Sequence, residues 1–250
     1  MLSATPLEGL PEVSHGDDLA ELIAKALPVA HRLSGQDVLA VAHKVVSKAE
    51  GRIRRLSEVE PGERARELGE QVDKDPRHVQ VILDESREVI RARRGVLICV
   101  THHGFVCANA GVDASNVPGE DAVVLLPVDP DASARRVRAR IRELTGVGPA
   151  VVITDSFGRA WRVGQCDVAI GCAGIDPVED WRGRPDTQGR ELKATVIAVA
   201  DQLAAAADLA RAKDRSQPVV LIRGAGPTTT GPDGPGGKAL IRPEEYDLFR

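Results

Sequence analysis

Apolar positions along the chain follow two alternating patterns. Some segments space them three and four residues apart, as in an amphipathic helix, and others are short unbroken apolar runs typical of buried strands. The predicted helices are 19–27, 62–74, 76–93, 129–144 and 190–213. The predicted strands are 37–43, a pair within 96–111 joined around Gly104, 122–128, 150–155, 166–175 and 218–224. Helices and strands do not alternate strictly, so the order predicts an α+β (mixed α/β) fold with a mixed sheet packed against helices.

Composition narrows the classes of partner. The chain has 33 basic and 37 acidic residues, a net charge of −4, so nothing global attracts a polyanion. Only six of its 250 residues are Phe, Trp or Tyr, too few for stacking along a single-stranded nucleic acid. The core must therefore be aliphatic, and we expect no nucleic-acid partner.

Targeting and redox signals are equally plain. The four cysteines at positions 99, 107, 166 and 172 match no zinc spacing. The first residues lack the basic and apolar regions of a signal peptide, and no apolar run reaches about 18 residues. The sequence therefore predicts a reduced cytoplasmic protein without a membrane partner.

The Gly/Pro-rich stretch 224–239 imitates two nucleotide motifs and matches neither. Gly237 stands where a P-loop needs lysine, and Ala239 follows Lys238 where a hydroxyl is required. Pro227 and Thr229 interrupt the dinucleotide-binding fingerprint. We interpret this stretch as an untethered tail in preference to a lid over a site.

Three polar stretches follow apolar strands, where sites in α/β proteins usually form. They are 44–52, which begins a predicted basic turn over 44–55, 109–116 and 154–162. Asp113, Asp155 and the Ser156 hydroxyl are hard oxygen ligands suited to Mg²⁺ or Mn²⁺. The cations that could neutralise phosphate are Lys44, Lys48, Arg159 and Arg162. Together these groups suit phosphoryl transfer, although each cluster alone is more often a turn or a solvated face.

Two other candidate groups are weaker. His102 and His103 are neighbours on a predicted strand and would point to opposite faces, so they cannot share one ion without a kink. Cys166 and Cys172 have no adjacent base in the sequence to activate a thiolate.

The polar stretches and their surroundings resemble the coenzyme F420-0:L-glutamate ligase family. The motifs that carry the resemblance are PLEGLPEV with GDDLAELI, VVSKAEGRIRRL, NAGVDASN, LLPVDPDASA, ITDSFGRAWRVGQCDVAIG, and DTQGRELKATV with VADQLAAAADL. They run in the family's order from about residue 6 to 224, which is nearly the whole chain.

The resemblance implies a fold, partners and site residues. It implies an intertwined, butterfly-like homodimer and a GTP-dependent enzyme that uses Mg²⁺ or Mn²⁺, with K⁺ as a further expected cation. Its catalytic residues map to Asp113, Asp155 and Arg159, and its metal ligands to Asp113, Asp155 and Ser156. The nucleotide-binding positions map to Pro11, Glu12, Val13, Ser14, His43, Lys44, Lys48 and Asn116.

The resemblance also implies boundaries and one departure. Residues 1–224 would form the ligase domain, and 225–250 a loop and tail of the same domain. Where some relatives carry an acidic metal ligand after the Ala-rich helix, this chain has Lys213, and either Asp214 or a water molecule could take the ligand's place. Some members carry a fused reductase-like domain; this chain ends at Arg250, so we expect either a stand-alone ligase or a truncated fusion.

The implied reaction adds L-glutamate to F420-0, a deazaflavin precursor, through an acyl phosphate. The expected alternatives are a metal-dependent phosphohydrolase, which would accept water as nucleophile, and a nucleotide-binding module that turns nothing over. Paired carboxylates favour chemistry over binding alone.

Overall fold

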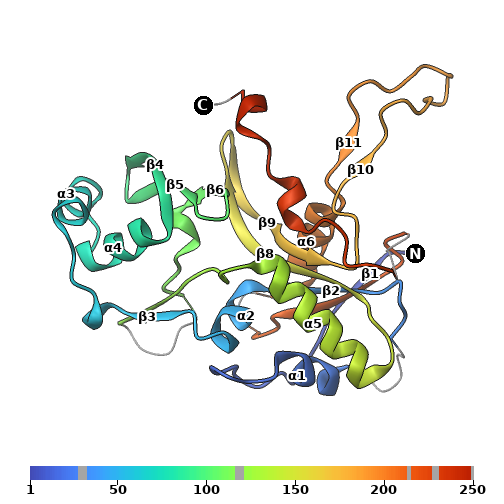
Figure 1. Cartoon of the computed structure of the whole chain (residues 1–250), viewed down its shortest axis with the longest axis horizontal. Coiled ribbons are helices and arrows are strands. Elements are labelled where there is room, and N and C mark those ends of the chain that lie inside the picture. The colour runs from blue at the N-terminus through green and yellow to red at the C-terminus, as the bar shows by residue number, and fades with distance from the viewer. Residues whose placement is uncertain (28–32, 116–120, 213–214, 227–230, 249–250) are drawn as a thin grey trace.

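The computed structural model describes residues 1–27, 33–115, 121–212, 215–226 and 231–248 (Figure 1). The α-helices in these ranges are α1 (Leu19–Ala26), α2 (His43–Ala49), α3 (Glu63–Val72), α4 (Pro76–Asp84), α5 (Pro130–Thr145) and α6 (Val199–Ala210). None of them has the length and apolar character needed to cross a membrane.

The main sheet has the order β1-β12-β2-β8-β9 within the described residues. Its strands are β1 (Ser3–Pro6), β12 (Val219–Arg223), β2 (Val38–Ala42), β8 (Ala150–Arg159) and β9 (Arg162–Ala173). Strands β2 and β8 run parallel, from the Val38–Ala150 pair to the Ala42–Thr154 pair, and the other neighbours are antiparallel. The mixed sheet confirms the predicted fold class, and the predicted strands 37–43, 150–155 and 218–224 lie in it.

Helices cover both faces of this sheet, which explains why its central strands are apolar at every position. Val151 and Ile153 of β8 pack into one cluster with α1 and α5, whereas Ala150 and Val152 pack into another with α6. Helix α5 begins where predicted, because Asp129 caps it by accepting the Ala132 N–H at 2.8 Å.

A second hydrophobic core lies beside the main sheet, under α3 and α4 (Figure 1). It packs against β4 (Ser86–Arg93) and β5 (Val96–Thr101), and β6 (Val106–Ala108) extends their sheet beside β5. Strand β3 (Ile53–Arg55) with β7 (Ala122–Val124) connects this core to the rest. The predicted turn at Gly104 is confirmed, since its φ of 99° is a conformation that favours glycine.

Four predicted elements are wrong in part. The strand over 122–128 is only the short β7, which ends at Val124. The helix over 76–93 ends at Asp84, and the chain continues as strand β4 paired with β5. The basic turn after β2 is in its first half the helix α2. In the described part of 190–213, which ends at residue 212, only α6 is helical. The short β10 (Glu179–Asp180) and β11 (Val196–Ile197) bound an arm that projects from the body (Figure 1).

The C-terminal segment is anchored, so the untethered-tail interpretation is wrong for its described part. The buried Asp131 carboxylate accepts the N–H groups of Gly237 at 2.6 Å and Cys172 at 2.9 Å. Arg138 donates to Asp233 Oδ1 at 2.8 Å. Residues 231–240 are thereby tied to α5 and β9, while 227–230 lie outside the described residues.

Candidate active site

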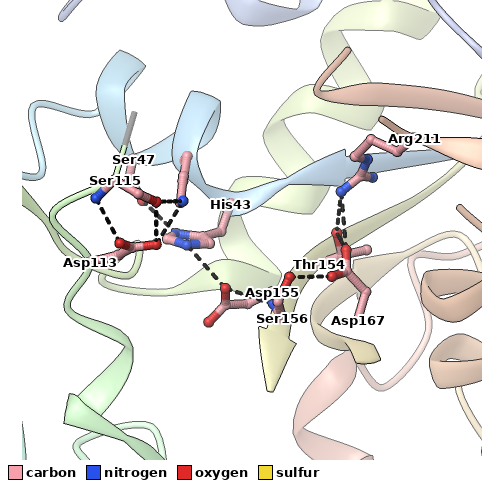
Figure 2. A network of polar contacts seen from close by, with 10 residues as sticks. His43, Ser47, Asp113, Ser115, Thr154, Asp155, Ser156, Asp167 and Arg211 are labelled. Carbon is pink, nitrogen blue, oxygen red and sulfur yellow. Dashed lines mark hydrogen bonds and ion pairs between the residues drawn. The ribbon is translucent and has the colours of Figure 1, made fainter. Parts of the chain in front are cut away.

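The candidate site forms where the parallel strands β2 and β8 end. Helix α2 starts directly after β2, so His43 and Lys44 emerge beside the residues that follow Thr154. The carboxyl ends of adjacent parallel strands are where ligands usually bind in α/β sheets. Figure 2 shows the side chains that meet there.

His43 and Asp155 form the first pair. The imidazole is 2% exposed, and its Nε2 lies 3.3 Å from Asp155 Oδ1. The two atoms are in contact without the alignment of a hydrogen bond, and Nε2 has no hydrogen-bond partner within the described residues. The Ser156 N–H donates to the same carboxylate oxygen at 2.8 Å, so the backbone and the imidazole both fix Asp155.

Lys44 and Asp113 form the second pair. The Lys44 ammonium donates to Asp113 Oδ2 at 2.7 Å and to Ser115 Oγ at 2.6 Å, while Ser115 N–H donates to Asp113 Oδ1 at 2.7 Å. Backbone bonds to Val124 hold Asp113 in place. Burial alone would raise the pKa of Asp113, but the hydrogen bonds from Lys44 and Ser115 outweigh it and lower the pKa below its ordinary value. Asp113 is therefore held as a carboxylate.

Lys48 and Glu12 form the third pair, one turn further along α2. The Lys48 side chain is only 7% exposed, whereas its partner Glu12 is 67% exposed. Of Glu12's neighbours, Val13 is buried in the core, while Pro11 and Ser14 are exposed. The predicted nucleotide-binding turn and lysine are thus adjacent in space.

The other predicted residues lie apart from these pairs. Ser156 follows Asp155 on a strand, and its hydroxyl donates to Asp167 Oδ1 at 2.6 Å on the opposite face of β8. Arg159 is exposed at the far end of the hairpin, where its guanidinium donates to Val163 O at 2.8 Å. Asn116, Lys213 and Asp214 lie outside the described residues.

A polar network that the sequence analysis missed lies on that opposite face. Asp167 Oδ2 accepts from Thr154 Oγ1 at 2.9 Å and from Arg211 Nη1 at 3.1 Å (Figure 2). Burial of Arg211 lowers the pKa of its guanidinium, and Asp167 opposes that shift. The available signal was a single carboxylate within the apolar strand 166–175, since a charge in a buried strand needs a partner.

Cys172 is not a nucleophile, and the two histidines do not share a ligand. Burial, followed by the charge of Asp131, raises the pKa of the Cys172 thiol to about 12, which removes it as a nucleophile at neutral pH. His102 Nε2 lies 2.8 Å from Asp84 O and His103 Nε2 lies 2.8 Å from Pro127 O, so the two rings bind separate partners.

The donor chemistry of the two acids fits a hard divalent cation. Asp113 and Asp155 offer carboxylate oxygens, and the Asp113 group already holds a cation, the Lys44 ammonium. In the described parts of the chain, no three His, Cys, Asp or Glu side chains are grouped closely enough to hold a metal ion.

Fold and site together define an α+β protein with paired acidic and basic side chains at the carboxyl ends of two parallel strands. A family model described as F420-0:gamma-glutamyl ligase matches residues 9–224, and the chain belongs to this family. The coenzyme F420:L-glutamate ligase of Methanopyrus kandleri is 47% identical over 251 residues, covering 100% of this chain and 97% of that protein. The proteins of the same name from Methanothermobacter thermautotrophicus and Archaeoglobus fulgidus are 44% and 45% identical. The first match covers 100% of this chain and 99% of that protein, and the second 98% and 95%.

Proposed function

We propose that this chain joins L-glutamate to F420-0 in coenzyme F420 biosynthesis, with GTP and a divalent cation, Mg²⁺ or Mn²⁺. The observation that carries the proposal is the convergence of the His43–Asp155, Lys44–Asp113 and Lys48–Glu12 pairs around the start of α2. These pairs supply lysine side chains that could bind phosphate and carboxylates that could hold a metal ion, as the family's activity would require.

The reaction needs an activated carboxylate. In the proposed route a carboxylate oxygen of the acceptor forms a bond to the γ-phosphorus of GTP, and the bond from that phosphorus to GDP breaks. The amine of glutamate then forms the amide bond, phosphate leaves, and a proton is released. Lys44 and Lys48 would neutralise phosphate oxygens, which is the main protein contribution in phosphoryl transfer.

The carboxylates Asp113 and Asp155 would hold the divalent ion. When bound, such an ion screens the repulsion between the acceptor carboxylate and the triphosphate. His43 is buried against Asp155 and would keep that side chain oriented. Ser156 as a metal ligand, Arg159 as a catalytic residue and K⁺ as a further cation stay predictions.

We retain the homodimer and the cytoplasmic location as proposals. Light scattering at micromolar concentration should give about twice 26.6 kDa. A monomer mass with full activity would contradict the dimer.

The experiment is incubation of the protein with F420-0, L-glutamate, GTP and Mg²⁺ or Mn²⁺, followed by mass spectrometry and assay of GDP and phosphate. We expect a product heavier by a glutamyl residue, with one GDP per amide formed. Phosphate release without glutamate addition would identify a phosphohydrolase. GTP binding without turnover would identify a binding module.

A further inference from the structure

Asp167 is a buried carboxylate whose role the proposed mechanism does not use. It lies on β9, is 2% exposed, and faces Thr154 and Ser156 across the hairpin (Figure 2). Three donors converge on it, the Ser156 and Thr154 hydroxyls and the Arg211 guanidinium. Both oxygens are therefore satisfied, which a buried carboxylate requires.

The direction of the contact with Ser156 follows from chemistry. An ionised carboxylate only accepts hydrogen bonds, so the Ser156 hydroxyl must donate its single proton to Asp167 Oδ1 over 2.6 Å. Toward any other group the Ser156 oxygen then acts through its lone pairs alone. Its N–H is committed as well, because it donates to Asp155 at 2.8 Å.

Arg211 keeps this arrangement from reversing. It follows the end of α6, and its side chain is 11% exposed, so the ion pair with Asp167 is nearly dehydrated. A buried guanidinium needs an acceptor, and Asp167 Oδ2 with Thr154 Oγ1 supplies one at 3.1 and 3.2 Å. The pair thereby connects α6 to the end of β8 that carries Asp155.

We propose that Asp167 is a positioning residue for the ligase reaction. It holds the Ser156 hydroxyl as a donor on the face of β8 opposite Asp155, and through Ser156 it fixes the backbone whose N–H orients the Asp155 carboxylate. This inference rests on the proposed function, because its test measures the rate of glutamate addition.

Asp167→Asn tests the direction of the bond with almost no change in size. Arg211 needs an acceptor, so the oxygen of the new amide should face Arg211 and its NH₂ group should face Ser156. Ser156 would then have to accept instead of donate. We expect kcat for glutamate addition to fall by about tenfold or more, with each KM changed less than about threefold, as for an interaction that matters only during reaction.

A double-mutant cycle separates positioning from general loosening. Ser156→Ala removes the hydroxyl through which Asp167 acts, so Asp167→Asn should lower kcat by less than about twofold in that background. Asp201→Asn is the matched control, since Asp201 also joins α6 to β9, by accepting the Ala169 N–H at 2.9 Å, without touching Ser156. It should keep kcat within about twofold of the unsubstituted protein.

Two outcomes would overturn the inference: multiplicative effects in the double variant, or a loss in Asp201→Asn as large as in Asp167→Asn. If the unsubstituted protein releases phosphate from GTP but adds no glutamate, the proposed function fails alone. The same cycle is then measured on phosphate release, and independence there would overturn the positioning role too.

Discussion

The two faces of β8 carry similar charges in opposite settings. On the Asp155 face, buried Lys48 is paired with Glu12, which is 67% exposed, and Lys44 with Asp113, which is 41% exposed. On the Ser156 face, Asp167 and Arg211 are 2% and 11% exposed. A substrate can displace an exposed partner at low cost, whereas separating a dehydrated pair leaves an uncompensated charge. The Asp155 face, called the open face below, is therefore suited to binding anions. The Ser156 face, called the closed face, is suited to holding the open face in place.

The largest expected effect is on the open face. Asp155→Asn should lower kcat/KM for glutamate addition about a thousandfold, or about 4 kcal/mol, because it removes one of the two charges that we propose hold the metal ion. The melting temperature should change little, since an amide of the same shape keeps the Ser156 N–H contact. Activity above a tenth of that of the unsubstituted protein would contradict a metal role.

How far the sequence predicts the molecule differs between its regions. The strands β2 and β12 and the core of β8 are unbroken apolar runs that both sheet faces require, so their pattern is unambiguous. In 76–93, Val89 and Ala92 suit either period, and pairing with β5 decides for a strand. Such long-range pairing is not visible in the local pattern.

The same limit applies to the site. Asp113 and Asp155 could be found because each follows an apolar segment directly. The contact of the Ser156 hydroxyl with Asp167 could not be found in this way, because it depends on the pairing of β8 with β9. Asp167 and Arg211 lie 44 positions apart in the chain, and only the packing of α6 on β9 brings them together.

The next largest expected effect is on the Asp167–Arg211 ion pair of the closed face. Arg211→Met should lower the free energy of unfolding by about 3 kcal/mol, because it keeps the stem but leaves Asp167 buried without its countercharge. Urea denaturation at pH 7 measures it. Lys44→Met is the comparison on the open face and should cost much less stability, since Asp113 can be hydrated. Equal losses would mean that the two faces do not differ as argued.

A smaller effect concerns the nucleotide. Lys48→Met should weaken GTP binding by about 10- to 30-fold, or about 2 kcal/mol, as expected for a charged hydrogen bond to phosphate. Isothermal titration calorimetry measures the dissociation constant. Unchanged affinity would remove Lys48 from the nucleotide site.

Glu12→Gln is the matched variant with the opposite sign. The Glu12 carboxylate forms an ion pair with the Lys48 ammonium and would compete with phosphate for it. Neutralising it should strengthen GTP binding by about threefold or less, because the competing partner is exposed. Weaker binding would indicate that the Glu12 carboxylate itself contacts the nucleotide.

The smallest expected effect is on the pH dependence of stability, which should differ between a buried carboxyl group and a paired one. Burial raises the pKa of Asp201 above its ordinary 3.8, although the Ala169 N–H opposes the shift. The folded state therefore holds a proton that the unfolded state releases, so stability falls as pH rises from the ordinary pKa through the raised one, and then stays level. Asp201→Asn lacks this penalty, so its stability relative to the unsubstituted protein should rise across that window, by less than about 1 kcal/mol at neutral pH.

Asp18→Asn should behave oppositely, because the hydrogen bond from Arg140 lowers the pKa of Asp18. This variant should be less stable than the unsubstituted protein at neutral pH, and the difference should vanish as pH falls through that lowered pKa. Urea denaturation from about pH 2 to 7 covers both windows, and parallel trends in the two variants would contradict the assignment of burial to one and pairing to the other.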